Sequence, residues 1–145
     1  MESVLPSTLG YHWVWVEVIG PDSQDFLQRL STVAVKNQKS GTGQAACFLS
    51  GVGKIEAFFY LWKISPEHFG IEIDAGVDEN HLRSLLAFIE KYTFRENLKV
   101  EVKKNLKCLW HLNTKEAPFT FKQENDLFFC HHSKREFGIP WASVW

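Results

Sequence analysis

Hydrophobic and polar residues alternate over much of this chain, which is the pattern of β-strands with one buried face. Short runs of glycine, proline and polar residues separate these segments and favour turns. The pattern predicts strands over residues 11–19, 44–49, 54–64, 69–74, 98–102, 106–112, 119–123 and 127–132. We expect the last two strands to form a hairpin across residues 124–126.

Two segments have the period of an α-helix instead. After the first strand, Asp22 or Ser23 can cap a helix whose apolar positions include Phe26. The second predicted helix has an apolar stripe that recurs every three or four residues. This stripe consists of Leu82, Leu85, Leu86, Ile89 and Tyr92. Asp78 and Glu79 precede the stripe, where negative charge suits the positive end of a helix dipole.

The order of predicted elements is β-α-β-β-β-α-β, followed by further strands. Two amphipathic helices can bury their apolar stripes against one face of a mainly antiparallel sheet. We therefore expect an α+β fold with a ferredoxin-like arrangement, two helices on one face and extra C-terminal strands. The length of 145 residues suits one domain over residues 1–145. A candidate internal boundary lies at residues 117–118, before the C-terminal hairpin.

Charge and hydropathy exclude several classes of partner. The formal net charge is −1, so no general field attracts nucleic acid or an anionic membrane. No apolar run is long enough to span a bilayer, and the first ten residues lack the regions of a signal peptide. We expect a cytoplasmic protein. Cys47, Cys108 and Cys130 lie in apolar strand segments without metal-binding spacing, which predicts reduced and unreactive thiols.

Aromatic residues are unusually frequent. The chain contains 12 Phe and 6 Trp, which can fill a core or, alternatively, line a pocket or a partner surface. The last six residues read PWASVW, although most domains end in polar residues that fray. We expect this end to be docked on its own domain or on another chain.

Several short motifs lack the context that their chemistry needs. Residues 53–55 read GKI, without the Ser or Thr and the following helix of a phosphate-binding loop. Residues 41–46 fit a dinucleotide-binding pattern but open a strand rather than a helix. His131 and His132 are neighbours on a strand and point to opposite faces, so they cannot share a metal ion. We predict no catalytic residue and no metal site.

Three segments follow one another in an order found in a known family. Residues 18–32 read VIGPDSQDFLQRLST, residues 43–55 read GQAACFLSGVGKI, and residues 91–102 read KYTFRENLKVEV. Together they resemble the N-terminal half of the glycine-cleavage T-protein (aminomethyltransferase) and YgfZ-type folate-binding family. The resemblance covers about residues 12–112 of this chain.

The resemblance implies a tetrahydrofolate site in a hollow. Aligned on Gly53, the catalytic Asp of the aminomethyltransferases falls on Ala57, so a methyl group is expected to face that hollow. Glu56 precedes it and is expected on the opposite face of the strand. An Asn that touches the pterin in the family falls on Asp74, which can accept pterin N–H bonds. The implied ligand-binding residues are Lys54, Glu56 and Asp74.

Because Ala57 stands at the position of the catalytic Asp, the resemblance favours a non-catalytic folate-binding protein of the YgfZ type. Such a protein acts as a helper in iron–sulfur cluster or one-carbon metabolism. The YgfZ-type signature with its reactive Cys lies in the second half of the family and has no counterpart here. An alternative is a truncated binding or assembly module without folate. Such a module forms a homo-oligomer or pairs with a partner chain that supplies the missing half. An active aminomethyltransferase is the third and least favoured hypothesis.

Overall fold

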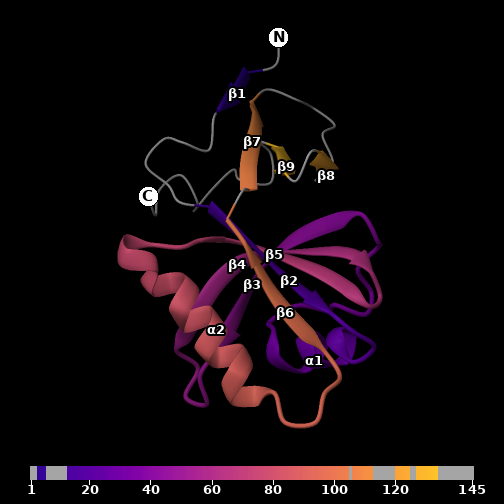
Figure 1. Ribbon diagram of the computed structural model, residues 1–145, viewed down its shortest axis with the longest axis vertical. Coiled ribbons are helices and arrows are strands. Elements are labelled where there is room, and N and C mark those ends of the chain that lie inside the picture. The colour runs from indigo at the N-terminus through magenta and orange to yellow at the C-terminus, as the bar shows by residue number, and fades with distance from the viewer. Residues whose placement is uncertain (1–2, 6–12, 105, 113–119, 125–126, 134–145) are drawn as a thin grey trace.

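The computed structural model describes residues 3–5, 13–104, 106–112, 120–124 and 127–133, with side chains over 13–104. Two β-sheets and two α-helices make up this part of the chain (Figure 1). The first half contains β1 (Ser3–Leu5), β2 (Trp13–Ile19), α1 (Ser23–Leu30), β3 (Thr42–Leu49), β4 (Ile55–Ser65) and β5 (His68–Asp74). A short 3-10 helix η1 (Val77–Glu79), α2 (Asn80–Tyr92), β6 (Lys99–Lys103), β7 (Leu106–Leu112), β8 (Thr120–Glu124) and β9 (Leu127–Ser133) follow.

The larger sheet has the strand order β3-β4-β5-β2-β6, and every neighbouring pair is antiparallel. Both helices contribute buried side chains to one hydrophobic core on a single face of this sheet. The α+β class and the broadly ferredoxin-like arrangement are therefore confirmed. Among the described residues, no helix is long and apolar enough to cross a membrane.

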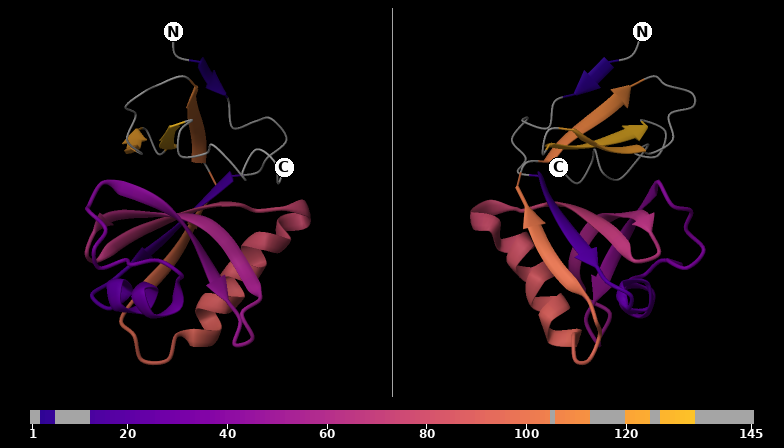
Figure 2. Two further views of the ribbon diagram at one scale, coloured as in Figure 1. Left: turned by 180° about the vertical axis from the view of Figure 1, so that it is seen from behind. Right: turned by 45° about the vertical axis from the view of Figure 1, so that its right-hand side comes forward.

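The smaller sheet has the order β1-β7-β9-β8, and β7 runs parallel to β9. The chain passes from one sheet to the other in the short step between Lys103 and Leu106. Figure 2 shows the smaller sheet beyond one end of the larger one. The predicted hairpin is confirmed as the antiparallel pair β8–β9. The candidate boundary at 117–118 and the C-terminal PWASVW segment lie outside the described residues.

The first face of the larger sheet is the hydrophobic core. Alternate residues of β2, Val14, Val16 and Val18, point into it, as the sequence pattern predicts. Phe48 of β3 stacks on Phe88 of α2 with ring centroids 4.6 Å apart, which ties the edge strand to the helix. Burial of these apolar surfaces supplies the main driving force for this layer.

The second face of the same sheet carries buried indoles that donate to buried carboxylates. Trp62 Nε1 donates to Glu72 Oε1 at 2.9 Å, and Trp15 Nε1 donates to Glu17 Oε1 at 3.2 Å. A Cβ added at Gly70 would lie only 1.8 Å from the Trp15 ring. Part of the aromatic content therefore packs against the sheet rather than against a ligand.

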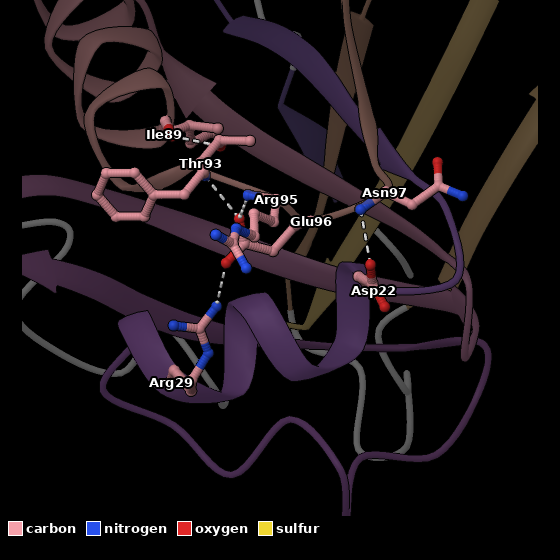
Figure 3. A network of polar contacts seen from close by, with 8 residues as sticks. Asp22, Arg29, Ile89, Thr93, Arg95, Glu96 and Asn97 are labelled. Carbon is pink, nitrogen blue, oxygen red and sulfur yellow. Dashed lines mark hydrogen bonds and ion pairs between the residues drawn. The ribbon is translucent and has the colours of Figure 1, made fainter.

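Polar contacts hold the α2–β6 connection against α1 (Figure 3). The Glu96 carboxylate accepts from the Phe94 N–H at 2.7 Å, from the Arg95 N–H at 3.1 Å and from Arg29 at 2.8 Å. The backbone N–H of Phe94, with these further donors, lowers the pKa of Glu96 below its ordinary value of 4.5. One side chain thus fixes the end of α2 relative to α1.

Two predicted helix starts differ from the structure. Asp22 is at the N-cap position of α1 but makes no side-chain capping bond, and its Oδ2 instead accepts from the Asn97 N–H at 2.6 Å. Asp78 and Glu79 have positive φ angles of 53° and 59°, and α2 begins only at Asn80. Asp78 and Glu79 nevertheless directly precede α2, where their negative charges suit the positive end of the helix, as the sequence predicts.

The outer strand β6 alternates charged residues with valines, and its charged residues lie on the same face of the sheet as Trp15 and Glu17. Lys99 Nζ lies 2.6 Å from Glu101 Oε1, and Lys103 Nζ lies 3.6 Å from Glu101 Oε2. Lys99 and then Lys103 lower the pKa of Glu101 through hydrogen bonding and charge. This strand ends the strand order of the larger sheet with a row of opposite charges.

Replacing Gly70 with Ala should destabilise the fold strongly, because the new methyl group would overlap the Trp15 ring inside a closely packed layer. We expect a loss of about 3 kcal/mol in the free energy of unfolding, measured by urea denaturation. The control is Gly51→Ala, since nothing lies within 4 Å of a Cβ added there. Equal stabilities of the two variants would contradict the packing of Trp15 on Gly70.

Replacing Glu96 with Gln should flatten the acid limb of the stability profile. The folded pKa lies below 4.5, so the wild-type carboxylate contributes its full stability above that pH and loses it as the pH falls through the folded pKa. Urea denaturation at several pH values below 5 should show a steeper loss of stability for wild type than for the variant. Glu90→Gln controls for removal of a surface charge, from the last turn of α2. Parallel wild-type and variant profiles would show that Glu96 has no such role.

Candidate functional site

A tight turn joins β3 to β4 and presents the first predicted site residues. The Ser50 N–H donates to the Lys54 carbonyl oxygen at 2.8 Å, and the Lys54 N–H donates to Ser50 Oγ at 3.1 Å. Gly53 has a φ of 82°, a left-handed conformation that glycine adopts without steric cost. The predicted strands over residues 44–49 and 54–64 are therefore confirmed, and a tight glycine-containing turn joins them.

A β-bulge follows the turn and changes which residues face the helix. Phe48 pairs with Ala57, but Leu49 pairs with Ile55, so Glu56 is the extra residue of β4. Ala57 is only 6% exposed and belongs to the hydrophobic core under α2. The expectation that the Ala57 methyl group faces a hollow is therefore wrong. Glu56 is exposed and borders a hollow beside α2, because the bulge interrupts the strict alternation of faces.

This hollow lies between the β3–β4 turn and α2 and has a volume of about 240 Å³. We call it the hairpin–helix hollow. Residues from both elements line it, and on α2 they recur at the spacing of one helical face. The lining consists of Ser50, Glu56, Ser84, Ala87, Phe88, Lys91 and Tyr92.

Aromatic rings form the part of the hollow nearest the core. Phe88 is buried, and its ring centroid lies 4.6 Å from that of Tyr92. The same Phe88 ring stacks on Phe48 of the sheet, so the core holds it in place. A flat heterocycle entering the hollow would contact aromatic rings that packing against the core holds in place.

Two opposite charges line the hollow without neutralising each other. Within the described part of the chain, neither Glu56 nor Lys91 takes part in an ion pair. The Lys91 ammonium lies 5.4 Å from the centroid of the Tyr92 ring, close enough for a cation–π interaction. Both charges are therefore available to a ligand.

Asp74 belongs to a different part of the surface. Its Oδ1 accepts from the Gly76 N–H at 3.0 Å and so shapes the turn after β5. A second hollow, of about 300 Å³, lies beside this turn. Its lining consists of Trp13, Val14, Ala75, Gly76, Asp78, Glu79 and Lys104. Its lining includes residues just before the start of α2, whereas the lining of the hairpin–helix hollow comes mostly from the second half of α2.

The structure therefore separates the three residues predicted to bind ligand. Glu56 lines the hairpin–helix hollow, whereas Lys54 belongs to the β3–β4 turn but is not among the lining residues. Asp74 lies beside the other hollow. Sequence reasoning missed Ser84 and Lys91, because exposed polar residues of a surface helix carry no signal of their own. The family-like phrase that begins at Lys91 was the available signal for that end of α2.

Other candidate chemistry is weak among the described residues. No group of three His, Cys, Asp or Glu side chains there could hold a metal ion. Cys47 is half-buried, and desolvation raises the pKa of its thiol, as the sequence predicts. The buried carboxylates Glu17 and Glu72 are occupied by the indoles described above.

Comparison with known proteins places the fold. No family model and no curated protein matches the chain. Among solved structures, it is similar to the glycine cleavage system aminomethyltransferase T from Bartonella henselae, with a TM-score of 0.57 and 20% sequence identity. The match covers 63% of this chain but only 24% of that enzyme chain. The matched 63% of this chain thus shares the fold of about a quarter of an aminomethyltransferase T, as the resemblance to the T-protein implies for the fold.

Proposed function

We propose that this chain is a non-catalytic, folate-binding protein of the YgfZ type, and that the hairpin–helix hollow receives the pterin ring. The observation that carries the proposal is the Glu56 carboxylate, which the bulge brings to a hollow with aromatic side chains. A pterin presents neighbouring N–H donors on one edge, and a carboxylate accepts two such bonds at once. The shared fold with aminomethyltransferase T supports a ligand of this class.

The position of Glu56 also supports binding without carbon transfer. A carboxylate stabilises developing charge best inside a closed site from which water is excluded. Glu56 is exposed, and the aligned position Ala57 is buried in the core. A helper role in iron–sulfur cluster or one-carbon metabolism in the cytoplasm then fits a protein that holds a folate without transforming it.

A second candidate is an assembly module, favoured by exposed apolar residues around the same turn. Val52 is 92% exposed and Ile55 is 59% exposed. Apolar side chains gathered at one exposed turn are typical of a surface that another chain covers. In this alternative the chain forms a homo-oligomer, or pairs with a chain that supplies the remainder of an aminomethyltransferase-like protein, and binds no folate.

Anaerobic titration with tetrahydrofolate by calorimetry tests the first proposal. Glu56→Gln should weaken binding about tenfold, because it removes a charge-assisted hydrogen bond to the pterin. The matched control is Glu67→Gln, an exposed carboxylate in the β4–β5 turn that should leave the Kd unchanged. Lys54→Ala and Asp74→Asn report whether the other two predicted residues contact the ligand. Absence of a binding signal with millimolar ligand would refute folate binding and leave the assembly module.

The absence of catalysis has its own test. The protein, supplied with tetrahydrofolate and an aminomethyl donor, should form no methylenetetrahydrofolate above the uncatalysed rate. An active aminomethyltransferase assayed in parallel shows that the assay detects product. Turnover that Glu56→Gln abolishes would overturn the non-catalytic proposal and identify Glu56 as the working acid.

A further inference from the structure

We infer that Lys91 binds the anionic tail of the folate, so that the hairpin–helix hollow selects folates over free pterins. This inference rests on the proposed function, because it assigns a second part of the same ligand to the same hollow. It goes further by giving the hollow two charged groups that recognise different parts of the ligand. Glu56 accepts hydrogen bonds from the pterin, and Lys91 pairs with a carboxylate of the p-aminobenzoylglutamate tail.

The size of the hollow requires part of the ligand to leave it. Pockets that enclose a drug-sized molecule have volumes of about 300–1,000 Å³. The hollow measures about 240 Å³, enough for a two-ring heterocycle but not for a whole folate. The remainder of a bound folate must therefore pass over the rim, and the residues at the rim decide what kind of tail is accepted.

Lys91 is placed at one end of the hollow along α2. Ser84 and Lys91 both line it and are seven residues apart, which corresponds to about 10 Å along the helix axis. The helical wall of the hollow thus has a hydroxyl near one end and an ammonium near the other. The cation–π contact with Tyr92 restrains the Lys91 side chain before a ligand arrives.

Hydrogen bonds to two carbonyl groups near the end of α2 reduce the repulsion that an anion would meet there. Free carbonyl groups at a helix C-terminus repel carboxylates. Here Thr93 Oγ1 donates to the Ile89 carbonyl oxygen at 2.6 Å, and the Thr93 N–H donates to the Glu90 carbonyl oxygen at 3.3 Å. With these two carbonyl groups occupied, the positive charge of Lys91 remains to attract an anion at this end of the hollow.

Lys91 and Glu56 together define a ligand with two different ends. A ligand with only N–H donors would leave Lys91 unused, and one with only carboxylates would be repelled by Glu56. Since neither charge is taken by an ion pair within the described residues, a molecule that offers both groups satisfies the hollow best. Folates have this combination, and free pterins do not.

Calorimetric Kd values for tetrahydrofolate and for 6-methyltetrahydropterin, which lacks the tail, test the inference at low salt. Wild type should bind tetrahydrofolate more tightly. In Lys91→Ala the affinity for tetrahydrofolate should fall about two- to fivefold, as expected for an exposed charge pair. The affinity for the tail-less pterin should not change. Lys91→Arg should keep the preference, and Arg83→Ala, an exposed cation of α2 that does not line the hollow, is the matched control.

The possible results separate this inference from the proposed function. If tetrahydrofolate binds and Glu56→Gln weakens it, but Lys91→Ala leaves the ratio of the two Kd values unchanged, the role of Lys91 is refuted and folate binding stands. If tetrahydrofolate does not bind wild type, both proposals fall. If Arg83→Ala reduces the preference for tetrahydrofolate over the tail-less pterin as much as Lys91→Ala does, the effect comes from the loss of any positive charge on α2. The assignment to Lys91 is then refuted. Unchanged thermal midpoints show that the variants are folded.

Discussion

Burial of the central strands β2 and β5 on both faces of the larger sheet is the constraint on which the rest of this structure depends. Side chains of β2 and β5 that point away from the helices are nearly as inaccessible as those that point into the core. A polar atom placed there must find a partner or lose its hydration without compensation. The chain meets this demand with indole–carboxylate pairs, in which Trp62 donates to Glu72 and Trp15 donates to Glu17.

The burial of the central strands also explains where the strand pairing can be irregular. The central strands β2 and β5 are buried on both faces, whereas the β3–β4 turn extends past the neighbouring strand β5. There the ladder can accept an extra residue, and the bulge at Glu56 is the result. A candidate binding residue thus arises at the one end of the hairpin where the sheet is least constrained, beside a helix that the core holds in place.

Much of the framework could be predicted from the sequence, because it follows from local periodicity. Alternation of Val14, Val16 and Val18 with tryptophan and glutamate identified β2 and both of its faces. The bulge could not be predicted, since its position depends on how β3 is held by α2, a contact between distant segments. The orientation of Ala57 was predicted wrongly because the bulge was not predicted. The parallel pairing of β7 with β9 was missed for a similar reason, because periodicity identifies strands but not their partners.

Outer strands of sheets are prone to join those of other molecules, and β6 has a defence against this. Its row of Lys99, Glu101 and Lys103 would meet a like charge in many registers if a second strand aligned with it. Unwanted pairing is thereby disfavoured at that margin without any cost to the core. The β3–β4 turn, by contrast, exposes the apolar side chains of Val52 and Ile55, so chance association through apolar surface is more favourable at this turn than along β6.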